Sequence, residues 1–224
     1  MEPFVQKEKI EGYKKFMGFH QCISNDNGKI WCFWTTNCQT TTMTNEDQQI
    51  TINISEEGGG NGLFVTAVYA KCTSTERREL WHSLERVNAM VNGPWCVGGD
   101  FNSILDTDEK LEGRPYRINK SIDFSNCMNN CELLDAGYVG VKFTWCNNRR
   151  PSKRIWKRLD RIMINDLWLQ KFQNNSVRHL VRTGSDHRPI LMKCFNNQQE
   201  PIKYFRFMEF WTDQNSFQEV VQET

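Results

Sequence analysis

Short apolar runs bounded by Gly, Asn or Pro recur along the chain, some alternating with polar residues and others continuous. Both patterns are typical of β-strands. The predicted strands are Lys29–Thr35, Gln49–Ser55, Leu63–Ala70, Trp95–Phe101, Phe143–Cys146, Arg158–Ile164 and Ile190–Cys194. Strands therefore outnumber helices in the predicted fold.

Helical periodicity occurs in three other segments. The strongest signal covers residues 73–91, where apolar residues share one face and Thr73 and Glu76 have the spacing of a capping box. Further helices are predicted at Lys120–Leu133 and at Lys9–Gly18, which ends at a glycine suited to a C-cap. With no internal repeat and no clear domain boundary, the pattern predicts one mixed α/β domain.

The composition is that of a globular protein, since the 224 residues are 38% hydrophobic and 25% charged. Because the formal net charge is only +1, any nucleic-acid binding must come from local basic patches. The nine cysteines include no CxxC pair, which predicts reduced thiols rather than a zinc site. No signal-peptide core is present, and no apolar run approaches the roughly 18 residues of a membrane span. We therefore expect a soluble intracellular protein with no membrane partner.

Polar side chains lie at the end of the predicted strand Trp95–Phe101. Gly98 and Gly99 permit tight backbone conformations, so that Asp100 and Asn102 can point the same way from the strand end. Ends of strands are where α/β folds usually bind ligands. The alternative is a turn in which the two side chains bond only their own backbone.

Two further acidic positions accompany predicted strands. Asp160 interrupts the strand "KRLDRIMI", where it needs a partner, and a salt bridge to Arg158 or Arg161 is the alternative to a functional role. In "GSDHRPIL", His187 is suited to carrying a proton or donating to an anion, and Asp186 is suited to a hard cation such as Mg²⁺. The alternative for this pair is an ordinary polar loop.

The motifs "GGDFNSI", "FTWCN", "KRLDRIMIN" and "SDHRPIL", in this order, resemble the endonuclease/exonuclease/phosphatase superfamily, which includes apurinic endonucleases and DNase-I-like nucleases. More narrowly, "GKIWCFW", "TAVYAKC", "ERRELW", "GYVGVKFTW" and "RLDRIMINDLW" resemble the endonuclease domains of plant LINE-type (non-LTR) retrotransposons. The similarity implies an endonuclease-like domain over residues 1–195. Residues 196–224 resemble the connector to a reverse transcriptase, and a tail helix packed on the domain is the alternative.

This resemblance implies a four-layered α/β/β/α sandwich, with two mostly antiparallel sheets flanked by helices. We expect the chain to lack the family's first strand, which carries an active-site asparagine, and this would leave one sheet edge unpaired. The family uses Mg²⁺ or Mn²⁺ and no small-molecule cofactor. The metal neutralises charge on the phosphate while an aligned water attacks it.

The resemblance also implies roles for individual residues. Asp100 corresponds to the aspartate that aligns or deprotonates the water, and Asn102 to an amide bonded to the same centre. His187 corresponds to the histidine that contacts the scissile phosphate, Asp160 to the aspartate that orients its ring, and Tyr69 to a phosphate-contacting tyrosine.

For the metal, the resemblance places the principal ligand at Glu2 and a second carboxylate, at or near the ion, at Asp186. A glutamate at position 2 would otherwise be read as a solvated terminal residue, so its assignment depends on the resemblance alone.

Residues 149–161, "RRPSKRIWKRLDR", contain seven Lys or Arg residues. Such a local density is typical of a phosphate-binding surface, and an aromatic residue within it can stack on a base. The candidate nucleic-acid-binding residues are Arg149, Arg150, Lys153, Arg154, Trp156, Lys157 and Arg158. The alternative is a solvated hairpin whose basic tip serves solubility.

Taken with the resemblance, these observations predict an Mg²⁺-dependent DNA endonuclease of retrotransposon type, acting in the nucleus. Two alternatives remain at this stage. One is a catalytically impaired retroelement remnant that binds nucleic acid weakly or not at all. The other is a phosphatase or RNA-processing member of the same superfamily.

Overall fold

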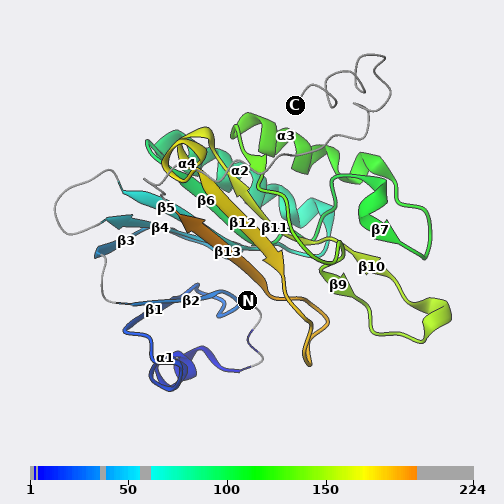
Figure 1. Cartoon of the computed structure of the whole chain (residues 1–224), viewed down its shortest axis with the longest axis horizontal. Coiled ribbons are helices and arrows are strands. Elements are labelled where there is room, and N and C mark those ends of the chain that lie inside the picture. Colours follow the sequence, from blue (N-terminus) through cyan, green and yellow to red (C-terminus); the bar gives the residue numbers. More distant parts are fainter. Residues whose placement is uncertain (1–2, 4, 36–38, 56–61, 196–224) are drawn as a thin grey trace, which may run out of the picture.

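The computed structural model describes residues 3, 5–35, 39–55 and 62–195. A six-stranded sheet lies at its centre (Figure 1). In spatial order its strands are β3 (Gln39–Asn45), β4 (Gln49–Ser55), β5 (Leu63–Tyr69), β6 (Trp95–Asp100), β11 (Asp160–Ile164) and β8 (Leu134–Asp135). Only β5 and β6 are parallel, because the helix between them returns the chain to the same end of the sheet.

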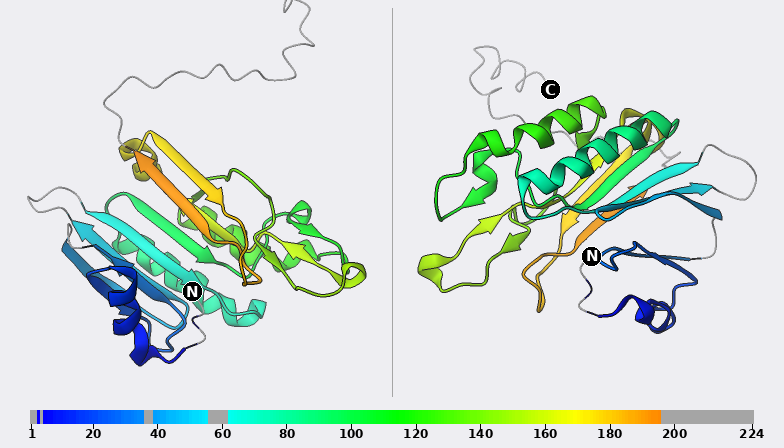
Figure 2. Two further views of the ribbon diagram at one scale, coloured as in Figure 1. Left: turned by 60° about the horizontal axis from the view of Figure 1, so that its bottom comes forward. Right: turned by 180° about the vertical axis from the view of Figure 1, so that it is seen from behind.

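Helices α2 (Ser74–Met90) and α3 (Ile122–Asn130) cover one face of this sheet (Figure 2). The apolar face of α2 contributes the buried residues Leu80, Leu84 and Val87 to the main core. The ring of Phe124 is stacked 5.0 Å from those of Trp81 and Phe101, which fixes α3 against α2 and the end of β6. Thr73 caps α2 by accepting a hydrogen bond from the backbone N–H of Glu76, as its sequence predicts.

The opposite face of the sheet is covered by two separate two-stranded sheets. One consists of β1 (Gln21–Ser24) and β2 (Trp31–Trp34), with α1 (Ile10–Met17) outside it. The other consists of β12 (Asn174–His179) and β13 (Ile190–Phe195). Each pair packs a small apolar cluster against the central sheet. The α/β class with several sheets flanked by helices is thus confirmed, although β2 and β13 are not joined into one second sheet within the described residues.

A third small sheet extends from the same end of the central sheet as the C-terminus of β6 (Figure 1). Its order is β7 (Lys110–Leu111), β10 (Trp156–Lys157) and β9 (Trp145–Cys146). The remaining helices are α4 (Asp166–Lys171) and the 3₁₀ helices η1 (Lys7–Lys9), η2 (Thr107–Glu109), η3 (Ile118–Lys120) and η4 (Pro151–Lys153). In the described part of the chain, no helix combines the length and apolar character that crossing a membrane requires.

Most predicted elements are confirmed, including α1, which ends at Gly18 with a left-handed φ of 76°. One prediction is wrong in detail: the expected strand Arg158–Ile164 begins only at Asp160, as β11, and β10 ends before it at Lys157, so Asp160 begins a strand instead of interrupting one. The cysteines within the described residues are free thiols, as predicted, and Cys38 lies outside these residues. The tail at 196–224 also lies outside them.

Four charged residues form a cluster at the junction of η2, β8 and β11, which we call the buried charge cluster: Glu109, Asp135, Arg158 and Arg161. The Arg158 guanidinium lies 2.9 Å from Glu109 Oε1 and 2.8 Å from Asp135 Oδ1. The Arg161 guanidinium lies 3.0 Å from Asp135 Oδ2 and also contacts Glu109. The side chain of Arg161 is fully buried. The cluster therefore balances two cations with two anions, and of the four side chains only that of Asp135 is partly exposed.

This pairing corrects two expectations from the sequence. Asp160 forms no salt bridge with Arg158 or Arg161, because Glu109 and Asp135 take both guanidinium groups. Arg158 is also buried, so it does not belong to the exposed basic surface with which it was grouped.

The buried charge cluster predicts a large loss of stability for Glu109→Gln. Removing one partner leaves an uncompensated buried charge, which costs about 3–5 kcal/mol. Urea unfolding should show this loss. The matched control is Asp108→Asn in the same 3₁₀ helix, whose exposed ion pair with Lys142 should be worth less than about 1 kcal/mol. Equal, small losses in the two variants would show that the cluster does not stabilise the fold.

Candidate active site

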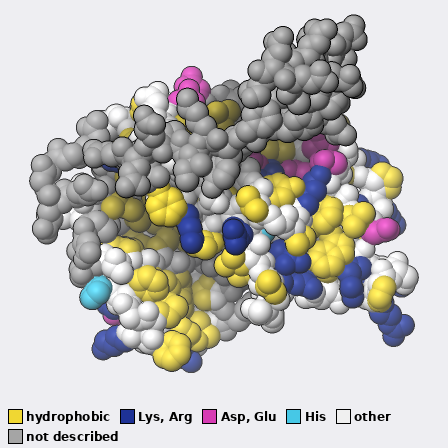
Figure 3. All heavy atoms as spheres, viewed as in Figure 1, with side chains coloured by type: hydrophobic (Ala, Val, Ile, Leu, Met, Phe, Trp, Pro, Cys, Tyr) yellow, Lys and Arg dark blue, Asp and Glu magenta, His cyan; other side chains and the backbone are white. Residues whose placement is uncertain are grey.

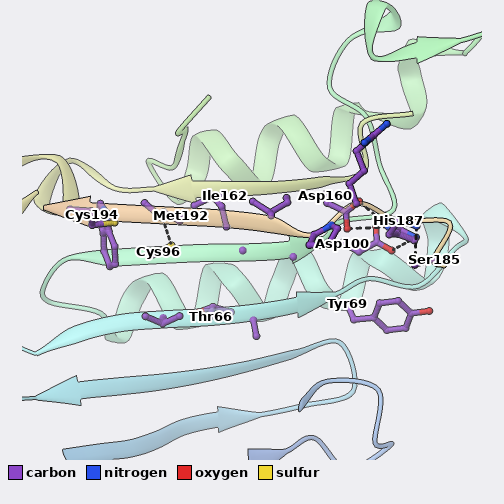
Figure 4. A pocket seen from close by; sticks show the side chains of 18 of the residues that line it. Thr66, Tyr69, Cys96, Asp100, Asp160, Ile162, Ser185, His187, Met192 and Cys194 are labelled. Atoms are coloured by element: carbon purple, nitrogen blue, oxygen red, sulfur yellow. Dashed lines mark hydrogen bonds and ion pairs between the residues drawn. The ribbon is translucent and has the colours of Figure 1, made fainter. Parts of the chain in front are cut away.

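Three of the predicted site residues lie in one row across the central sheet. Asp100 at the end of β6 is opposite Tyr69 of β5 and opposite Asp160 of β11. Since directly opposite residues project from the same face of a sheet, the register brings all three side chains together. Both aspartates are buried, and all three residues line one cavity (Figure 4).

The turn after β6 joins Asp100 to Asn102. Gly99 has φ 147°, a conformation that favours glycine, and Asn102 itself adopts a left-handed φ of 48°. The backbone N–H and the side-chain amide of Asn102 donate to the Asp100 carboxylate over 2.8 and 2.9 Å. The same amide donates to the carbonyl of Ala70 over 2.8 Å. The predicted pairing of these two side chains and the alternative backbone turn are therefore both present.

Asp160 and His187 form a hydrogen-bonded pair. Nδ1 of His187 lies 2.9 Å from Oδ2 and 3.1 Å from Oδ1 of Asp160, and it must donate because a carboxylate only accepts. Nε2 of the same ring is directed towards Asp100, 4.0 Å from its Oδ2 (Figure 4). The ring is thus held by one carboxylate and presents its other nitrogen to a second.

These carboxylates set the charge of His187. Burial alone would lower the pKa of the imidazole, but the hydrogen bond that the ring donates to Asp160 and the negative charges of Asp160, Asp100 and Asp186 raise this pKa to about 9. In the metal-free protein, the ring is therefore protonated at neutral pH.

Thr144 connects the two segments that carry this pair. Its side-chain oxygen accepts the backbone N–H groups of Leu159 and Asp160, over 2.9 and 3.0 Å. Its carbonyl accepts the N–H of Arg188 over 2.7 Å, next to His187. Thr144 is buried, so no solvent competes for these bonds. The motif "FTWCN" contains this residue, but its role depends on two distant backbone segments meeting and has no signal in the sequence beyond the motif.

Asp100, Asp160 and His187 form the group of metal-ligand side chains in the described residues, with ligand atoms within 4.8 Å of one another. Two buried carboxylates are suited to a hard divalent cation. Asp186 lines the same cavity but is exposed, and its carboxylate accepts the indole N–H of Trp145 over 3.0 Å. Glu2, the other predicted ligand, lies outside the described residues.

The cavity of about 720 Å³ extends from these residues along the central sheet, beneath β13 (Figure 4). Away from the aspartates its walls are mostly apolar. They include Val65, Ala67, Cys96, Ile162, Met192 and Cys194. The polar group therefore lies at one end of an apolar groove, where the low polarity of the walls strengthens its electrostatic interactions.

The predicted basic residues lie beside this end of the sheet, on β10 and on the hairpin that precedes it. Lys and Arg side chains gather on the right of the face in Figure 3, over the region of β7, β9 and β10. Arg149, Arg150 and Lys153 are exposed, and the Arg182 guanidinium lies 5.3 Å from the ring centroid of Trp156. Arg154 and Lys157 are half-buried.

A sequence model of the Endonuclease/Exonuclease/phosphatase family matches residues 31–187. None of the curated proteins matches the chain.

Solved structures share the fold. The endonuclease domain of TRAS1, a telomere-specific non-LTR retrotransposon, is 12% identical with a TM-score of 0.63 over 86% of this chain and 94% of that one. A 3′ phosphatase NExo from Neisseria, bound to a product DNA hairpin, is 15% identical with a TM-score of 0.60 over 82% of each chain. Truncated Caenorhabditis elegans TDP2 is 15% identical with a TM-score of 0.55, over 86% of this chain and 82% of that one.

The Asp160–His187 pair predicts a pH dependence. In the folded protein the pKa of His187 is raised from its ordinary value of 6.5 to about 9. The pair therefore contributes its full stabilisation below pH 6.5, and this contribution is lost as the pH rises through about 9. Asp160→Asn should lower the pKa of His187. NMR titration of the His187 ring in the presence of a chelator measures the pKa in the wild type and in the variant. An unchanged His187 titration would contradict the assigned cause.

Thr144→Val should destabilise the protein by about 1–3 kcal/mol, because it leaves two buried backbone N–H groups without an acceptor. Urea unfolding measures this loss. Thr144→Ser keeps the hydroxyl and should retain most of the stability and the raised pKa of His187. If valine and serine behave alike, the side-chain oxygen of Thr144 is not what connects the two segments.

Proposed function

Because the chain belongs to the endonuclease/exonuclease/phosphatase family, we propose that it hydrolyses phosphodiester bonds in DNA with a divalent cation, as an endonuclease of retrotransposon type. The observation that carries the proposal is the arrangement of Asp100, Asp160 and His187. It places a protonated imidazole between two buried carboxylates at the end of an open groove.

Each side chain has a task in such a reaction. Asp100, held by two hydrogen bonds from Asn102, accepts a proton from the attacking water and aligns it. His187, charged and oriented by Asp160, donates through Nε2 to a phosphate oxygen and stabilises the negative charge that develops there. Tyr69 lies in the same row and lines the same cavity, and we assign its hydroxyl to donate to another phosphate oxygen.

Glu2 and Asp186 are proposed to hold a divalent cation, and the buried carboxylates of Asp100 and Asp160 supply negative charge that would attract it to this end of the groove. Such a cation, Mg²⁺ or Mn²⁺, neutralises charge on the phosphate when bound. Because a cation at this position would repel the charged imidazole, we expect it to lower the pKa of His187.

DNA is favoured as substrate over a small phosphate ester by the exposed basic side chains next to the site. The hairpin between β9 and β10, which carries the exposed Arg149, Arg150 and Lys153, extends away from the central sheet (Figure 1), so that a long polyanion can reach it and a small ester bound at the reacting groups cannot. A TRAS1 endonuclease domain with the same fold supports the comparison with retrotransposon enzymes.

Nicking of supercoiled plasmid in Mg²⁺ tests the proposal. Asp100→Asn and His187→Gln should each reduce nicking at least about 100-fold, since removing one acid–base group costs that much or more, and EDTA should abolish it. Asp47→Asn and His82→Gln, which change exposed residues of the same types, should nick like the wild type.

Circular dichroism must first show that each variant is folded. Undiminished nicking by both active-site variants would contradict the assignment. Absence of nicking by the folded wild type would favour a remnant without activity. Faster release of phosphate from a 3′-phosphorylated oligonucleotide than nicking would favour a phosphatase.

A further inference from the structure

Two lysines face each other across neighbouring strands beside the candidate active site. Lys157 of β10 is opposite Lys110 of β7 on one side and opposite Trp145 of β9 on the other. Like charges directly opposite each other destabilise a sheet. In the described residues, no carboxylate lies within ion-pair distance of either ammonium group. Neither ammonium group is therefore neutralised by a carboxylate in this part of the structure.

The rest of the surroundings adds positive charge. Burial lowers the pKa of Lys157, and the charges of Lys110, Arg77 and Lys120 lower it further. The ammonium group of Lys110 donates to the carbonyls of Glu112 and Arg114, which hold it in place without neutralising it. An anion is what this group of cations lacks.

The same row leads to the candidate active site. Trp145 forms a β-bridge with His187, so His187, Trp145, Lys157 and Lys110 occupy successive positions from one segment to the next. Neighbouring strands lie about 4.8 Å apart, which places Lys157 about 10 Å and Lys110 about 15 Å from His187 along this row. The Lys157 ammonium lies 5.4 Å from the ring centroid of Trp145, and Asp186 fixes the indole N–H of that ring.

We propose that Trp145, Lys157 and Lys110, which we call the lysine row, form a subsite for the phosphate backbone of duplex DNA beyond the scissile phosphate. In this arrangement, one DNA strand runs from the scissile phosphate at His187 across β9, β10 and β7. Each DNA strand has one phosphate per about 3.4 Å of helix axis. The two lysines therefore reach phosphates about three to four base pairs from the scissile phosphate. The half-buried Trp145 ring offers an apolar face beside them. The position of the scissile phosphate rests on the proposed function, but binding to the row does not.

Binding is measured without cleavage, by fluorescence anisotropy of a labelled 20-base-pair duplex in EDTA over a series of salt concentrations. Lys157→Met keeps the aliphatic stem over Trp145 and removes the charge, and Lys110→Met is the second variant. A plot of the logarithm of the association constant against the logarithm of the salt concentration has a negative slope. Each variant should make this slope less steep by about 0.9, which corresponds to roughly eight-fold weaker binding at 0.1 M salt. Lys9→Met removes an equal charge from an exposed position on η1 and should change neither value.

Urea unfolding supplies a second readout. Lys157→Met should be at least as stable as the wild type, because it removes a like-charge contact, whereas a lysine engaged in an unseen ion pair would lose stability. Unchanged affinity and slope in both lysine variants would overturn the proposal, as would a wild type that binds no duplex at low salt. A wild type that binds through the lysine row but does not nick plasmid would refute the proposed function and leave the subsite intact.

Discussion

The arrangement of the site depends on where two buried arginines find their counter-ions. Arg158 and Arg161 lie on either side of Asp160 in the sequence, and a carboxylate so close would be their natural partner. Glu109 and Asp135 take both guanidinium groups instead, from η2 and β8. Asp160 is thereby left to accept the imidazole N–H of His187. The buried charge cluster thus fixes the end of β11 and also determines which partner Asp160 has.

The site combines residues on rigid strands with a residue on a loop. Asp100 and Asp160 are ends of hydrogen-bonded central strands, whereas His187 belongs to the loop before β13. A loop residue has more conformational freedom than a strand residue, and its orientation must be fixed by contacts. Thr144 supplies them by bonding both segments from a buried position. The precision of the Asp160–His187 pair therefore depends on a residue that itself performs no chemistry.

Sequence patterns predicted the elements that carry a strong hydrophobic signal and missed those that do not. The run at 49–55 matches β4, and the capping pattern at Thr73 marks the start of α2. In contrast, β3 is largely polar because it lies at the edge of its sheet, and β12 buries only Val177 and His179. Motif resemblance identified Asp100, Asp160 and His187 as members of one site. The distances between their side chains, however, follow from the register of the strands, which no local sequence pattern encodes.

The basic stretch shows why charge along the sequence is a poor guide to charge on the surface. Among its residues, Arg158 and Arg161 are buried and neutralised by carboxylates, while Arg149 and Arg150 remain exposed. Lys157 is intermediate, since it is partly buried yet has no carboxylate within ion-pair distance in the part of the chain that the structure describes. Desolvation makes an unpaired cation of this kind interact more strongly with an incoming anion than an exposed one does. Burial and pairing, rather than density along the chain, therefore decide which of these cations contribute to binding a phosphate backbone.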